Sequence, residues 1–306
     1  MKTFLLTPAI ALLNQLPYRR KFILISVAIF IPLAVLTYLF VSSLNDSITF
    51  NAKERTGIEY IKVARTLLLQ VQNHLNVSDA ALNDVWAGIG LNAQQELVDV
   101  ALKAVEAVDQ KLGGPDKLNT AEKWPPVKEK WQSLKDQTLS IKDNLGTHAA
   151  LLGDITALIA HVGDTSNLIL DPDLDTYYLM AQEVLRFPSI MNNLQQARML
   201  GKEVLARKSM TSEEKTQLIF LFSRISADLD TIKNDIAVVF RENTAVKTEL
   251  STRFDTATTA ISIFQDILGE KIIKAPQLVL SDYAYAEQAS KAIGDVFKLY
   301  SAAEPI

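Results

Sequence analysis

The sequence contains no cysteine among its 306 residues. Disulfide bonds, thiolate metal sites and cysteine nucleophiles are therefore excluded, even in an oxidising compartment that would permit disulfides. Proline is sparse after Pro32, which leaves several long stretches open to helix formation. No stretch shows the sustained alternation of apolar and polar residues that a half-buried strand requires. These absences predict an all-α fold that is stabilised by packing alone.

An excess of basic charge is also missing. The chain has 31 basic and 35 acidic side chains, which gives a formal net charge of -4. Residues 1–21 contain four of the basic side chains and no acid, so residues 22–306 carry 27 basic against 35 acidic side chains, a net charge of -8. A nucleic-acid-binding domain needs a basic surface that replaces counterions. The composition therefore argues against nucleic acid as a partner.

Sequence signatures of catalysis are absent as well. There is no HExxH motif, P-loop, nucleophile elbow or paired-cysteine cluster. His161 and Asp164 lie three residues apart and could share a metal ion, but two ligands do not make a site. We therefore expect no enzyme, no catalytic residue, no cofactor and no metal site.

One long apolar run is present near the N-terminus. Phe22–Val41 carries no charge and directly follows Arg19, Arg20 and Lys21. A helix of this length spans the hydrocarbon core of about 30 Å, whereas the apolar region of a secretory signal is usually shorter, about 7 to 15 residues. We interpret the run as a transmembrane helix. The alternative is cleavage after Ser43 by signal peptidase, which would release a soluble protein.

The basic residues before the run predict its orientation. Because positive charge stays on the cytoplasmic side, residues 1–21 are expected in the cytoplasm, residues 22–41 in the membrane and residues 42–306 outside. The expected location is the bacterial inner membrane, with one span and with the bulk of the chain in the periplasm.

Apolar residues in the exported part recur at helical spacing. The clearest series steps by four and three from Val127 to Val162, as in a heptad seam. Thr211 and Glu214 have the spacing of a capping box, and Ser281 or Asp282 can begin the last helix. We predict helices over residues 42–86, 92–112, 125–170, 172–208, 212–242, 245–273 and 282–302.

The first of these helices, residues 42–86, is expected to continue the membrane helix without a break. A helix of this length extends about 65 Å, which is more than one compact bundle needs. We therefore predict an elongated antiparallel helical bundle, arranged as two bundles stacked along the membrane normal.

The segment Asp164–Met180 contains four aspartates, an asparagine and two adjacent tyrosines. One interpretation is purely structural, with Asp171 as a helix cap and Pro172 at the first helical position. A second is a calcium loop, because Asp171, Asp173 and Asp175 have the spacing of the first EF-hand ligands. That interpretation fails because Thr176 and Gln182 replace the required glycine and glutamate.

A third interpretation of the segment is a small-molecule site between two helices. Asp164 and Asn167 lie one turn apart on the incoming helix, and Tyr177 and Tyr178 begin the outgoing helix. They offer donors, acceptors and aromatic surface around a possible pocket.

Two arginines are candidate ligands for an anion. Arg65 lies on the first exported helix and Arg198 on the fourth. Together they could clamp a carboxylate or an oxyanion, because a guanidinium suits planar partners. The alternative for each is a solvated or salt-bridged surface arginine. His148 occupies a position of the heptad seam where an apolar residue is expected. It is either a core histidine or a group that senses pH or contacts a ligand.

Four segments resemble a known class of receptors. They are PYRRKF at residues 17–22, GIEYIKVARTLL at Gly57–Leu68, DTSNLILDPDLDTYYLM at Asp164–Met180 and FPSIMNNLQQARMLG at Phe187–Gly201. Their order resembles the extracytoplasmic sensor region of bacterial transmembrane receptors, which include methyl-accepting chemotaxis proteins and related sensor histidine kinases and diguanylate cyclases. The chain is similar to helical nitrate/nitrite-sensing and bimodular sensor domains. The resemblance implies stacked helical bundles that bind a small solute and pass a displacement inward.

Two function classes follow. In the first, the chain is the ligand-binding part of a transmembrane receptor, most directly a methyl-accepting chemotaxis protein, and its ligand is a small solute such as an anion or carboxylate. In the second, it is a single-pass, membrane-anchored helical module with a structural or partner-binding role. The sequence shows no second span, HAMP linker, kinase motif or GGDEF motif. A homodimer is compatible with either class.

Overall fold

The computed structural model describes residues 14, 17–83, 89–136, 141–170 and 173–303. Within these ranges every regular element is a helix and none is a strand, which confirms the predicted all-α class. The chain divides into two compact units, Met1–Ala52 and Lys53–Ile306, and the boundary falls within helix α2 (Tyr18–Asn83).

The first unit presents an apolar helical surface. Its large apolar side chains between Phe22 and Val41 are exposed, and the Thr37 hydroxyl donates to the Leu33 carbonyl oxygen at 2.8 Å. Among the described helices, α2 and α5 (Ile141–Thr165) are long and apolar enough to cross a membrane. In the most apolar 18-residue stretch of α5, 39% is buried, whereas none of the corresponding stretch of α2 is buried. An exposed apolar helix of this length is compatible with a membrane anchor.

The second unit contains residues 53–83 of α2 and the helices that follow it. The α-helices are α3 (Ile89–Leu112), α4 (Trp124–Asp136), α5, α6 (Leu174–Ala181), α7 (Phe187–Arg207), α8 (Ser212–Glu242), α9 (Thr244–Leu268) and α10 (Asp282–Ala302). A 3-10 turn, η2, covers Leu168–Leu170. Two π-helical segments, η3 (Gln182–Arg186) and η4 (Gly269–Ile273), precede α7 and follow α9.

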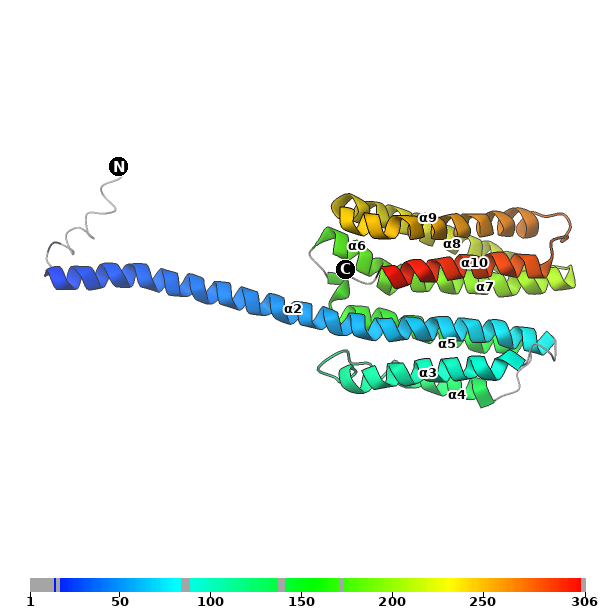
Figure 1. Ribbon diagram of the computed structural model, residues 1–306, viewed down its shortest axis with the longest axis horizontal. Coiled ribbons are helices and arrows are strands. Elements are labelled where there is room, and N and C mark those ends of the chain that lie inside the picture. The colour runs from blue at the N-terminus through cyan, green and yellow to red at the C-terminus, as the bar shows by residue number, and fades with distance from the viewer. Residues whose placement is uncertain (1–13, 15–16, 84–88, 137–140, 171–172, 304–306) are drawn as a thin grey trace. The chain divides into compact units, whose positions relative to one another are not determined.

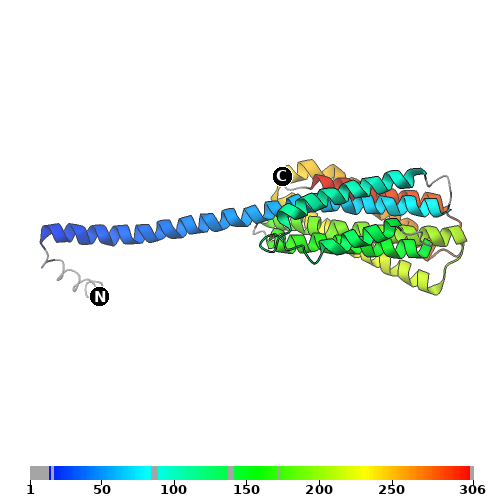
Figure 2. The ribbon, with the colours of Figure 1, turned by 90° about the horizontal axis from the view of Figure 1, so that it is seen from below.

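The helices of the second unit form two antiparallel groups (Figure 1). Residues 53–83 of α2 pack with α3, α4 and α5 in the first helical group, and α7–α10 form the second helical group. The axes in both groups run along the same direction, as the perpendicular view also shows (Figure 2). Helices α2 and α5 lie between the α3–α4 pair and the second helical group. The predicted stacking along the membrane normal is not confirmed, because the two groups lie side by side.

Helix ends in the second helical group follow the predicted caps. Thr211 and Glu214 form the capping box, with the Glu214 N–H donating to Thr211 Oγ1 at 3.2 Å and the Thr211 N–H donating to the Glu214 carboxylate at 2.9 Å. The Ala284 N–H donates to Ser281 Oγ at 3.4 Å at the start of α10. Helices α8 and α10 begin and end at the predicted residues.

The single helix predicted over residues 125–170 is wrong. Two antiparallel helices, α4 and α5, occupy this range (Figure 1). Lys130 on α4 forms an ion pair with Asp154 on α5. The heptad seam continued across the reversal because both helices bury residues in one core, for example Trp131 on α4 and Ile155 on α5.

Candidate functional site

Arg65 is buried inside the second unit, although it is a cation. It lies on α2, where that helix faces the second helical group, and only 4% of the residue is exposed. Its Nη1 donates to the main-chain carbonyl oxygen of Tyr300 at 2.9 Å, near the end of α10. The guanidinium carbon also lies 4.9 Å from the centre of the Tyr300 ring, a cation–π distance.

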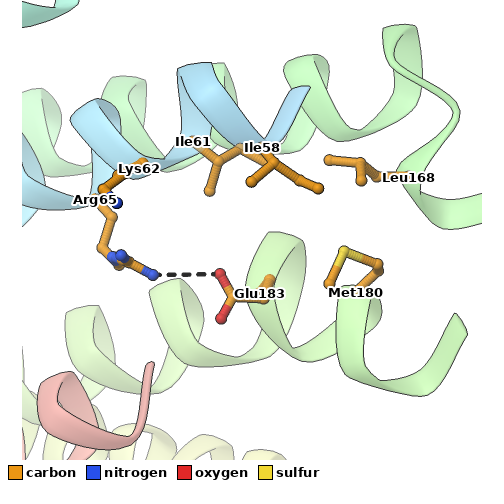
Figure 3. Close-up of a pocket in the computed structure, with 7 residues that line it drawn as sticks. All are labelled: Ile58, Ile61, Lys62, Arg65, Leu168, Met180 and Glu183. Carbon is orange, nitrogen blue, oxygen red and sulfur yellow. Dashed lines mark hydrogen bonds and ion pairs between the residues drawn. The ribbon is translucent and has the colours of Figure 1, made fainter. Parts of the chain in front are cut away.

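Glu183 supplies the opposite charge. Arg65 Nη1 lies 3.5 Å from Glu183 Oε2, and 5% of each side chain is exposed (Figure 3). The Tyr300 hydroxyl donates to the main-chain oxygen of Glu183 at 2.7 Å. Three elements, α2, η3 and α10, therefore meet at one buried ion pair.

Glu183 lies in a π-helical segment for a reason that the sequence contains. Pro188 is the second residue of α7, two positions after η3 ends, and it has no N–H with which to bond the carbonyl of Val184 one turn earlier. Its ring also crowds that carbonyl, so the turn before it widens. Single π-helical turns inside α-helices occur frequently at functional sites.

A small cavity lies beside the ion pair. The two charged side chains line it together with Ile58, Ile61, Lys62, Leu168 and Met180 (Figure 3). Its volume is about 10 Å³, which is at the lower limit for one water molecule. The site therefore combines a buried cation, a buried anion and almost no free space.

Arg198 occupies a different position between the same helices. Its Nε donates to Ser290 Oγ on α10 at 2.9 Å, and its Nη1 donates to Asn76 Oδ1 on α2. Gln195 Nε2 donates to the same Asn76 oxygen at 2.7 Å. Burial lowers the pKa of Arg198 from its usual value, and Asp79 opposes this effect.

The structure does not bring the two predicted arginines together. On α10, Arg65 contacts Tyr300 and Arg198 contacts Ser290. Ten residues of helix separate these contacts, which corresponds to about 15 Å. A single small anion does not reach both guanidinium groups in this arrangement.

The first half of the Asp164–Met180 segment makes a tight chain reversal. Asp164 is exposed near the end of α5, and Asn167 has a φ of 66°, which asparagine tolerates better than most residues. The Leu170 N–H donates to the Asn167 carbonyl oxygen at 2.8 Å. Both predicted ligand residues thus have structural positions in a turn.

The second half of the segment packs against α8 and contacts Asn243, the residue between α8 and α9. Tyr177 is 40% exposed and Tyr178 is half-buried, and their rings meet edge to face at 5.2 Å. Asn243 Nδ2 donates to Asp175 Oδ2 at 2.9 Å, and this hydrogen bond lowers the pKa of Asp175. The segment borders the Arg65 cavity through Leu168 and Met180, not through its predicted polar residues.

The predicted cap at Asp171 and Pro172 lies outside the described residues. Within the described ranges, no group of three or more histidine, aspartate or glutamate side chains is placed to hold a metal ion. Asp173 is the N-cap residue of α6, but its side chain makes no capping hydrogen bond.

His148 is a buried core residue that contacts a second histidine. Its Nδ1 lies 2.8 Å from the Asn144 carbonyl oxygen, and its Nε2 lies 2.8 Å from His74 Nδ1. A carbonyl only accepts, so the geometry assigns the His148 proton to Nδ1 and the shared proton to His74. Burial, with a smaller effect of His148, lowers the pKa of His74 to about 3, and burial lowers the pKa of His148 to about 4.

Sequence reasoning missed Glu183 and Tyr300. The sequence does contain a signal for Glu183. Gln182 and Glu183 are two adjacent polar residues that interrupt a largely apolar run shortly before Pro188. Tyr300 accepts from Arg65 through its main-chain oxygen, which leaves no residue signature in the sequence, and its ring and hydroxyl reach Arg65 and Glu183 only through the tertiary fold.

Comparison with family models, curated proteins and solved structures gives no match. The resemblance to bacterial sensor regions therefore remains a prediction, and so does ligand binding by the six residues proposed from the sequence.

Proposed function

We propose that this chain is the ligand-binding part of a bacterial transmembrane signalling receptor, most directly a methyl-accepting chemotaxis protein. The ligand is a small solute, an anion or a carboxylate. The observation that carries the proposal is the occurrence, in one chain, of an exposed apolar helix and of a buried arginine beside a cavity.

The membrane part of the proposal rests on Phe22–Val41. These residues are apolar and exposed, and three basic residues precede them. In the proposed topology the N-terminus is cytoplasmic and the second unit is periplasmic. The helical groups would then form the sensor, as a monomer or a homodimer.

The ligand part of the proposal rests on Arg65. A buried guanidinium is a strong and directional partner for a planar anion. The Asp164–Met180 segment borders the same cavity through Leu168 and Met180. Its polar residues Asp164, Asn167, Tyr177 and Tyr178 are proposed as secondary ligand contacts outside the cavity lining, and Arg198 is proposed to act at a separate position.

Signalling would use a population shift. A ligand that binds one arrangement of α2, η3 and α10 more tightly than another changes the balance between them. Because Arg65 is on α2, the ligand acts on the same helix that contains the proposed membrane span. A small displacement of packed helices is a common form of such a response.

A second candidate function is a membrane-anchored structural or partner-binding module. The small cavity favours it, since a volume of about 10 Å³ accommodates no solute larger than water. In this case Arg65 and Glu183 would serve only to position α2.

A ligand screen on the full chain in detergent tests the first function. We expect at least one small anion or carboxylate to raise the melting temperature, because a ligand at 100 times its Kd stabilises the folded state by about 2.7 kcal/mol. Arg65→Met should remove this shift. Arg241→Met, at an arginine whose side chain is 65% exposed, should retain it.

Failure of every solute to raise the melting temperature would contradict the sensor proposal and leave the structural module. If the ligand still raises the melting temperature of Arg65→Met, the ligand binds at another position.

A further inference from the structure

Glu183 is already seated at the guanidinium of Arg65. We propose that its carboxylate occupies the position that the anionic group of a ligand takes, so that Glu183 competes with the ligand for Arg65. The ligand class is a small planar monoanion of carboxylate size, such as formate, acetate or nitrate. The inference rests on the proposed function for the choice of Arg65, and it adds the group that the ligand must displace.

The space around the ion pair supports replacement of Glu183. The cavity of about 10 Å³ has no room for a carboxylate-sized anion next to the existing one. Ile58, Ile61 and Met180 line its apolar side (Figure 3). Packed side chains of this kind resist expansion. An anion therefore reaches Arg65 when the Glu183 carboxylate leaves.

The charges lead to the same conclusion. Only 5% of the Arg65 side chain and 5% of the Glu183 side chain are exposed, so both charges are largely removed from water. Each charge therefore needs the other as its counterion. A second anion in the same volume would place two negative charges close together, which is unfavourable. Exchange of one carboxylate for another keeps one cation with one anion.

The contact geometry is suited to exchange. The Nη1–Oε2 distance of 3.5 Å is longer than the 2.7–2.9 Å of a strong charge-assisted hydrogen bond. Tyr300 holds the main-chain oxygen of Glu183, so the backbone stays in place while the side chain rotates. Lys62 is exposed and lines the cavity, so a second positive charge lies beside the ion pair.

Chemical rescue of the full chain in detergent tests the inference. Glu183→Ala removes the competing carboxylate and leaves a space of that size beside Arg65. We expect acetate or formate to raise the melting temperature of this variant saturably, by a few degrees, and to shift the unsubstituted chain less. Acetamide, a neutral molecule of the same shape, should have no such effect.

The matched control is the double variant Arg65→Met with Glu183→Ala, which should not respond to acetate. Rescue that persists in this double variant, or an equal response to acetate and acetamide, would overturn the inference.

Glu183→Gln provides a second test if the alanine variant does not fold. It keeps the side-chain shape and replaces the charged competitor by a neutral amide. We expect its Kd for nitrate to be at least about tenfold lower than that of the unsubstituted chain. An equal or higher Kd would overturn the competition.

The outcomes separate this inference from the proposed function. A ligand of the unsubstituted chain whose affinity does not change in Glu183→Gln would disprove the competition and support the sensor. Absence of any ligand for the unsubstituted chain, together with Arg65-dependent rescue of Glu183→Ala, would support the competition and contradict the sensor.

Discussion

At the scale of single residues, the protonation of His74 and His148 is set by one main-chain carbonyl. Asn144 fixes the proton on His148 Nδ1, and His74 therefore donates to His148 Nε2. His74 Nε2 is then a buried acceptor without a hydrogen bond among the described residues. The Trp131 ring lies edge to face at 4.8 Å from the His74 ring. The pair is stable in its neutral form because a proton added here would be poorly solvated.

We predict that the free energy of unfolding falls between pH 7 and pH 5. The folded pKa values of about 3 and 4 lie below the unfolded value of about 6.5, so the unfolded chain binds more protons in this range and acid favours it. The expected loss is about 2 kcal/mol for each histidine, or about 4 kcal/mol for both. Urea unfolding of the full chain in detergent at the two pH values measures it.

The control for the pH prediction is His74→Gln with His148→Gln, which removes both titrating rings. The loss between pH 7 and pH 5 should shrink in this variant. If it stays the same, other groups cause the pH dependence.

At the scale of helices, α2 buries two faces of different character. The face toward the first helical group contains Tyr60, Leu67 and Val71, which are fully buried, and the Tyr60 hydroxyl donates to Asp109 on α3 at 2.8 Å. The face toward the second helical group alternates polar residues with the apolar Ile61, Leu68 and Leu75 at heptad spacing. The polar residues, which we call the polar seam, are Arg65, Gln72 and Asp79, which are buried, and Asn76, which is half-buried. Arg65, Asn76 and Asp79 contact α7 or α10. A search for apolar periodicity finds Ile61, Leu68 and Leu75 on this face but misses the polar residues between them.

Other element boundaries were predictable only where the chain has a local signal. The first residues of α8 and α10 were predicted correctly because Thr211, Glu214 and Ser281 form N-terminal caps. The reversal between α4 and α5 was missed because residues 137–140 include neither glycine nor proline. The π-helical segment was not predicted, although Pro188 is a local signal for it, and recognising Glu183 as the partner of Arg65 needed a tertiary contact between residues 118 positions apart.

We predict that Gly57→Ala lowers the free energy of unfolding. A Cβ at this position of α2 would lie 2.1 Å from Ser166 Oγ and 2.4 Å from Ser166 Cβ, so the chain reversal after α5 must shift. The expected loss is about 1–3 kcal/mol, which is typical of overpacking, and chemical denaturation measures it.

Gly146→Ala on α5 is the matched control for Gly57. A Cβ there meets no atom within 4 Å, so the substitution should raise stability by about 0.5–1 kcal/mol through helix propensity. A stabilising effect at Gly57 would contradict the close approach of α2 to Ser166.

At the scale of the whole molecule, the absence of cysteine makes the proposed topology directly measurable. Ser47→Cys introduces a unique thiol at an exposed position after the apolar run. We predict that a membrane-impermeant maleimide labels it from outside the cytoplasmic membrane. Replacing Arg19, Arg20 and Lys21 by glutamine should make the orientation mixed, since the positive-inside bias is reduced.

Three exposed lysines of the second unit, Lys103, Lys111 and Lys117, provide the control for this loss of charge. Their replacement by glutamine should leave the labelling one-sided. Labelling of Ser47→Cys only from the cytoplasmic side would reverse the topology.

The polar seam also determines where the second unit begins to open. Water can replace a hydrogen-bonded partner at a small cost in free energy, but it cannot replace apolar contacts. One continuous apolar core includes residues of both helical groups, and within their boundary Asn76, Asp79 and Arg65 meet the second helical group through polar atoms. We therefore expect water to enter this boundary first at the polar seam, while the apolar contacts keep the two groups together.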